Sequence, residues 1–163
     1  MAFLSNFDIN GYGLSAQRVR INVISSNIAN AQTTRTSEGG PYRRREVIFK
    51  AIDFNEHFNK ELSKNSNLHE YEDPLSEGLR GAKAVPPAMS VRVDKIVRDD
   101  SQPKMKYEPS HPDADAKGYV AYPNINPVVE MSDLIEATRA YQANVSAFQS
   151  AKNIADSSID LLR

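Results

Sequence analysis

The two ends of the chain carry the same hydrophobic rhythm, and a long, mostly polar middle separates them. Near the C-terminus, apolar side chains recur at alternating spacings of three and four, as in a heptad seam on one face of a helix. The seam consists of Met131, Leu134, Thr138, Tyr141, Val145, Phe148, Lys152, Ala155, Ile159 and Leu162, with Lys152 as its polar interruption. This end is predicted to be a long helix that packs against another helix.

The N-terminal end repeats the pattern at intervals of seven residues. Its seam consists of Phe7, Leu14, Ile21 and Ile28, with Ile24 and Ala31 at the intervening positions of the last two turns. A second helix that needs a helical partner is therefore predicted here.

Each predicted helix also carries a stripe of small side chains on another face. The stripes consist of Ala137, Ala140, Asn144, Ala147 and Ala151 near the C-terminus, and of Asn22, Ser25, Ser26 and Ala29 near the N-terminus. A solvated face would normally be charged, whereas small side chains let another backbone approach closely. Because 163 residues leave too little other material to cover all these faces, we predict that other subunits bury the terminal helices.

The pattern predicts an α+β chain in three parts: an N-terminal assembly helix (1–34), a small β-rich central domain with extended linkers (35–126) and a C-terminal assembly helix (127–163). The two helices are expected to form a coiled-coil-like assembly core. The polar segment near 53–90 has lost its periodicity and is predicted to be mobile, and residues 55–67 within it are expected to form a short helix or a mobile loop.

Within the central part, strands are expected at residues 42–52 and 91–97, with a short third strand at 105–107 pairing back. Residues 111–127 are rich in proline and are expected to form an extended linker. Asn126 is the predicted N-cap of the last helix, with Pro127 at its first position.

Composition narrows the classes of function. The chain has no tryptophan, a formal net charge of -1 and no long basic stripe, which argues against nucleic-acid binding. The run Arg43–Arg45 is interpreted as a solvated strand edge. Absence of cysteine excludes disulfides and makes a zinc site improbable. No membrane span and no Sec-type signal peptide are expected from the sequence.

Candidate chemistry is sparse. Asp113, Asp115 and Gly118 resemble the start of a calcium loop, but Lys117 and Asn124 stand where two oxygen ligands belong. The three histidines are far apart in the sequence, and no catalytic pair is visible. We therefore expect no enzyme activity, no cofactor and no metal site, and keep an enzyme or calcium-binding module that uses the loop 113–124 as an alternative class.

Asn27 and Asn30 lie one turn apart on an otherwise apolar helix, and two interpretations are equally favoured. In the first, Asn30 ends the helix and Asn27 faces solvent. In the second, both amides are buried between neighbouring helices, where they fix the register at some cost in stability.

The segment Ser-Asn-Ile-Ala-Asn-Ala at residues 26–31 resembles the signature of the bacterial flagellar axial proteins, the rod and hook family. Two further stretches, residues 107–126 and 130–144, are similar to the proximal-rod members of that family. The resemblance covers roughly residues 1–50 and 91–163, and residues 53–90 match nothing comparable.

This resemblance implies a structural subunit that polymerises through its terminal helices into the drive shaft that transmits motor torque for motility. The implied location is the basal-body rod across the periplasm, reached through the flagellar type III export apparatus without a cleaved signal. Implied partners are other proximal-rod subunits, copies of the chain itself, the membrane-side rod adaptor and the distal rod segment. A non-polymerising helical adaptor and a different rod or hook subunit remain alternatives.

We therefore predict an assembly interface on the two terminal helices. Its residues are Leu14, Ile21, Ile24, Asn27, Ile28, Asn30, Met131, Leu134, Tyr141, Val145, Phe148, Ile159 and Leu162.

Overall fold

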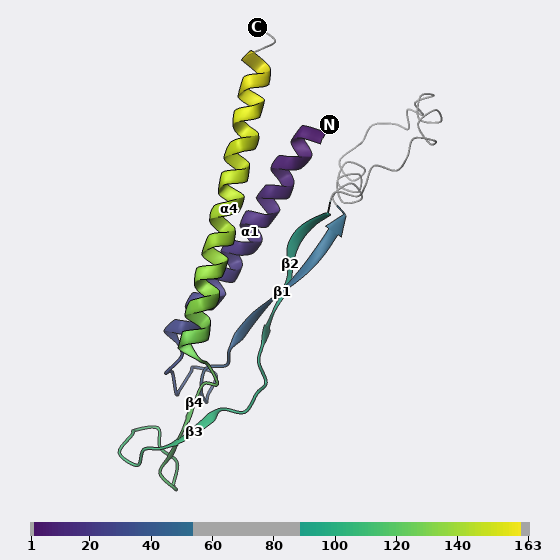
Figure 1. Ribbon diagram of the computed structural model, residues 1–163. Helices are drawn as coiled ribbons and strands as arrows, with labels where there is room; N and C mark the ends of the chain where they lie inside the picture. The colour runs from purple at the N-terminus through teal and green to yellow at the C-terminus, as the bar shows by residue number, and fades with distance from the viewer. Residues whose placement is uncertain (1, 54–88, 161–163) are drawn as a thin grey trace, which may run out of the picture.

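The computed structural model describes residues 2–53 and 89–160. Two long helices and two small antiparallel sheets make up this part of the chain (Figure 1). In chain order the elements are α1 (Ala2–Ala29), β1 (Arg45–Asp53), β2 (Met89–Arg98), β3 (Lys104–Tyr107), β4 (Tyr119–Tyr122) and α4 (Pro127–Asp160). The α+β class predicted from sequence is confirmed. Most of the polar segment predicted to be mobile near 53–90 falls outside the described residues.

The two helices lie side by side and run in opposite directions, so that both termini are at the same end of the molecule (Figure 1). Their contact surface is made partly from small side chains. Ala16 of α1 and Ala137 of α4 are fully buried, and a Cβ added at Gly13 would lie 3.1 Å from the Nδ2 atom of Asn144. Within the single chain, α1 thus already covers part of the small-residue stripe of α4.

The seam of α4 also meets α1. The rings of Phe7 and Phe148 pack edge to face with their centroids 5.0 Å apart. Asn126 caps α4 as predicted, because its side-chain Oδ1 accepts a hydrogen bond of 3.1 Å from the backbone N–H of Val128.

No helix in residues 2–53 and 89–160 is long and apolar enough to cross a membrane.

Strands β1 and β2 form a two-stranded antiparallel ribbon beside α1, and its register shifts between Ile48 and Phe49. The first predicted strand was placed too early, since β1 begins at Arg45. The ribbon begins near the end of α1 and the start of α4, and from there it extends beside the helix pair (Figure 1).

The expected pairing of the third strand is wrong. β3 pairs with β4, which lies inside the stretch predicted to be an extended linker. The turn between them depends on Asp115, whose Oδ1 accepts hydrogen bonds of 2.8 Å from the backbone N–H groups of Lys117 and Tyr119. Gly118 supplies the left-handed backbone conformation, with φ of +83°. Proline density marked this stretch as non-helical, but Pro112 and Pro123 flank the strand rather than interrupt it.

Replacement of two neighbouring glycines of α1 by leucine tests the close packing of the helices. Gly11 is exposed and nothing lies within 4 Å of its added Cβ. Gly11→Leu should therefore raise the free energy of unfolding by up to about 1 kcal/mol through helix propensity. Gly13→Leu gains the same propensity but pushes against Asn144, and should lower stability by about 1–3 kcal/mol.

Urea unfolding followed by far-ultraviolet circular dichroism measures both changes. Equal effects of the two substitutions would contradict close approach of the helices at Gly13.

Candidate assembly interface

A buried polar cluster, which we call the junction, joins the helix pair at its closed end, where α1 ends and α4 begins. It consists of Asn27, Tyr42, Arg44 and Glu130 together with the backbone of Arg45. The junction therefore connects α1, the segment that leads into β1, and the first turn of α4.

The loop after α1 positions two of these side chains. Asn30 ends the helix, because its Nδ2 donates to the Ser26 carbonyl at 2.9 Å and its Oδ1 accepts from the Thr33 hydroxyl at 3.1 Å. The chain then turns back, and the backbone N–H of Tyr42 donates to the Thr33 carbonyl at 3.0 Å. This return places Tyr42 and Arg44 against the end of α1.

Asn27 uses all four of its side-chain hydrogen-bonding positions and is 1% exposed. Its Nδ2 donates to the Arg45 carbonyl at 2.9 Å and to Glu130 Oε2 at 3.0 Å. Its Oδ1 accepts from the Tyr42 hydroxyl at 3.1 Å and from the Arg45 backbone N–H at 3.0 Å. Each of the two sequence interpretations is thus half right, since Asn27 is buried and Asn30 is the helix end.

Glu130 is a buried carboxylate, 1% exposed, in the first turn of α4. Its Oε1 accepts a hydrogen bond of 2.6 Å from Arg44 Nε, while Oε2 accepts the amide of Asn27. The hydrogen bond from Arg44 to Glu130 raises the pKa of Arg44 above its ordinary value. A buried charge is costly unless it is paired and fully hydrogen-bonded, so loss of either partner should cost several kcal/mol.

Sequence reasoning missed Tyr42, Arg44 and Glu130 as members of this cluster. Arg44 was interpreted as part of a solvated strand edge, and no contact of Tyr42 or Glu130 was predicted. The spacing of a helix predicts which residues share its face, but it contains no information on which distant loop residue meets that face.

The predicted interface residues differ widely in exposure. Ile24 and Asn27 are buried within the chain; Met131 and Ile159 are 52% and 64% exposed. Half-buried positions are Leu14, Ile21, Ile28, Asn30, Leu134, Tyr141, Val145 and Phe148, while Leu162 lies outside the described residues. Of the half-buried residues, Phe148 packs against Phe7 of α1. Met131 and Ile159 stay more than half exposed, and Ile159 lies on the same side of α4 as Phe148, in the part of the helix that extends beyond the start of α1.

Helix α4 carries further outward-facing apolar side chains along most of its length. They are Val128, Val129, Ile135 and Ile154, in addition to Met131 and Ile159. We call these six exposed residues the outer apolar face of α4; at about 100° per residue they spread around more than half of the helix circumference and do not form a single stripe. Exposed apolar side chains repeated along one helix are typical of an interaction surface.

The calcium-like stretch uses its carboxylates for internal contacts. Asp113 Oδ2 accepts a hydrogen bond of 2.7 Å from the Thr34 hydroxyl, and the backbone N–H of Tyr119 is the main cause that lowers the pKa of Asp115. Among the described residues, no three metal-ligating side chains are grouped closely enough to hold an ion.

Both ends of the chain match models of known protein families. The family model "Flagella basal body rod protein" matches residues 7–35, and the model "Flagellar basal body rod FlgEFG protein C-terminal" matches residues 116–161.

Full-length relatives extend this likeness to the whole chain. The flagellar basal-body rod protein FlgC of Borreliella burgdorferi is 41% identical, over 100% of this chain and 99% of the relative. The proteins of the same name in Bacillus subtilis and Escherichia coli O157:H7 are 36% and 35% identical, over 94% of this chain and 94% and 93% of the relatives.

An Asn27→Asp substitution tests the junction with little change in side-chain volume. It would put a second carboxylate beside Glu130 and remove both N–H donors, so the free energy of unfolding at pH 7 should fall by about 3 kcal/mol. Repulsion by Glu130 raises the folded-state pKa of the introduced carboxyl. Because a raised pKa stabilises the folded state only below that pKa, the deficit should shrink as the pH falls.

Thermal unfolding between pH 5 and 8 measures this effect, with Asn22→Asp on the exposed side of α1 as the control. A pH-independent deficit equal to that of the control would contradict the junction.

Proposed function

The chain belongs to the family of the flagellar basal-body rod protein FlgC, and we propose that its two long helices join it to neighbouring subunits of the rod. The chain is a structural subunit of the flagellar basal-body rod. Its proposed contribution to the rod is its packing surfaces. The observation that carries the proposal is the outer apolar face of α4, whose side chains α1 leaves uncovered.

The helix pair supports this role by its asymmetry. α4 spans 34 residues and α1 spans 28, so α4 extends beyond the start of α1 at the end where both termini lie (Figure 1). A lone helix is marginal in water, and packing supplies most of its stability. Neighbouring helices in the rod would bury the outer apolar face, at about 1.5–3 kcal/mol for each large side chain removed from water.

Family membership supports a finer proposal. We propose that the subunit polymerises into the proximal part of the shaft that transmits torque, in contact with copies of itself, the other proximal-rod subunits, the membrane-side adaptor and the distal rod. Its location would be the periplasmic span of the basal body, reached through the flagellar type III export apparatus. A coiled-coil-like core formed by the helices of several subunits would give the shaft resistance to twist.

A non-polymerising helical adaptor is the second candidate, because α1 and α4 already pair within one chain. The two functions differ in what they require of the outer apolar face. A rod subunit needs it covered by neighbours, whereas an adaptor with an intramolecular helix pair does not.

The double substitution Met131→Glu and Ile159→Glu tests the rod function. Both side chains are already more than half exposed, so the isolated chain should keep its helix content and its unfolding midpoint. In the rod, however, two carboxylates would be buried without partners, and incorporation into basal bodies and swimming should both be lost. The measurements are immunodetection in purified basal bodies and colony spreading in soft agar.

Gln142→Glu with Gln149→Glu adds the same charge at two other exposed positions of α4 and serves as a comparison. Normal spreading of the Met131 and Ile159 double variant would overturn the proposal in favour of the adaptor.

A further inference from the structure

The two faces of the β1–β2 ribbon differ in chemistry. Residues directly opposite each other in the register share a face, and the faces alternate along each strand. One face, called here the inner face, carries the pairs Val47 with Ile96 and Phe49 with Val93, and Val47 and Phe49 line a hollow with Val23 and Ile24 of α1. The opposite, outer face carries Lys50 directly across from Arg92, with Lys95 one pair further along.

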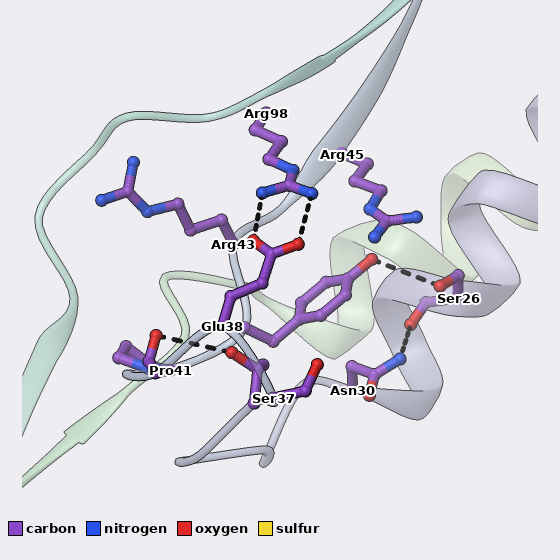
Figure 2. A pocket seen from close by; sticks show the side chains of 11 residues that line it. Ser26, Asn30, Ser37, Glu38, Pro41, Arg43, Arg45 and Arg98 are labelled. Carbon is purple, nitrogen blue, oxygen red and sulfur yellow. Dashed lines mark hydrogen bonds and ion pairs between the residues drawn. The ribbon is translucent and has the colours of Figure 1, made fainter.

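The inner face also contains a pair of like charges, and the chain neutralises it. Arg45 lies opposite Arg98 in the register. Glu38 holds Arg98 through two hydrogen bonds of 2.6 and 3.0 Å, and Figure 2 shows this carboxylate and guanidinium facing each other in a second hollow, which Arg45 also lines. The guanidinium of Arg45 lies 5.7 Å from the centroid of the Tyr42 ring. Arg98 and Arg45 together hold the pKa of Glu38 below its ordinary value, with the hydrogen bond from Arg98 as the main cause.

The outer face also carries cations opposite each other, but no carboxylate of the described residues neutralises them. Lys50, Arg92 and Lys95 are all exposed, and none of them forms an ion pair with any residue in 2–53 or 89–160. Two acidic residues lie nearby in the register. Glu46 is within 3.9 Å of Arg44, and Asp94, at the shift in register, makes no ion pair with the three cations.

Like charges directly opposite each other destabilise an antiparallel pair. A two-stranded ribbon is also marginal by itself in water. A cluster of three cations on such a ribbon therefore costs stability in the free chain, and an external counter-charge would recover it.

We propose that the outer face of the ribbon docks an acidic segment of a neighbouring protein subunit, whose carboxylates bridge Lys50 and Arg92 as Glu38 bridges the inner pair. The inference rests on the proposed rod function, since it takes the neighbour to be another subunit of the same assembly. Charge complementarity identifies the partner's chemistry: a guanidinium and two ammonium groups side by side match two or more closely spaced Asp or Glu side chains. Placed on a ribbon that extends beside the helix pair, this contact would be separate from the helix contacts.

A zero-length carbodiimide cross-linker tests the proposal, because it couples a lysine Nζ to a carboxylate only when the two are in contact. Purified basal bodies would be treated and digested, and the coupled peptides identified by mass spectrometry. We expect Lys50 and Lys95 to couple to Asp or Glu of another subunit in basal bodies, and not in the dilute free chain. Lys104, an exposed lysine on β3, is the internal control and should not be enriched.

Three outcomes would overturn the proposal: no coupling of Lys50 and Lys95, coupling no greater than that of Lys104, or the same coupled pairs in the free chain. The first two would mean that the cations form a solvated stripe, which protects ribbon edges from unwanted pairing. Failure of the rod function itself would look different, since no peptides of the chain would then be found in basal bodies.

A charge reversal supplies an independent readout. Lys50→Glu with Arg92→Glu should leave the unfolding midpoint of the free chain unchanged or raise it. The substitutions replace a pair of opposed cations by a pair of opposed carboxylates, and the nearby Lys95 attracts the carboxylates. In basal bodies the double substitution should abolish the coupling of Lys95 to another subunit and reduce incorporation at least tenfold relative to Lys104→Glu. Incorporation equal to that of Lys104→Glu would contradict docking at this face.

Discussion

The hydrogen bonds of Asn27 are the constraint on which the rest of the structure depends. Four hydrogen bonds hold this buried amide. Two are with the backbone of Arg45 at the start of β1, one is with Tyr42, and one is with Glu130 in the first turn of α4. Because every donor and acceptor of the amide is used, a shift of either helix would leave a buried polar group unpaired. The junction thus fixes the closed end of the molecule, and the ion pair of Arg44 with Glu130 neutralises the carboxylate that takes part in it.

Away from the junction the packing serves two purposes. Small residues such as Gly13 and Ala137 bring α1 and α4 into close contact, so this part of the interface is satisfied within one chain. The outer apolar face of α4 is not satisfied in this way. One helix pair is thus aligned within the single chain, and under the proposed rod function neighbouring subunits would cover the exposed side chains of α4.

The sequence predicted the elements that depend on local rules. Seam periodicity located both helices, and the Asn126–Pro127 cap located the start of α4 correctly. Prediction failed where residues distant in the chain meet. The partner of β3 depends on the turn that Asp115 and Gly118 make, and the burial of Glu130 depends on Arg44 returning from a loop. Nothing in the spacing of either residue indicated its partner, so Asn27 could only be left between two interpretations.

Amide hydrogen exchange, compared between the dilute free chain and purified basal bodies, tests the central claim most directly. In the free chain, the amides next to the junction, in residues 20–29 and 127–137, should be the most protected of the two helices, because the buried hydrogen bonds hold them there. Residues 151–160 of α4 should exchange quickly in the free chain and become protected in the rod. Uniform protection along α4 in the free chain, unchanged on assembly, would contradict the account.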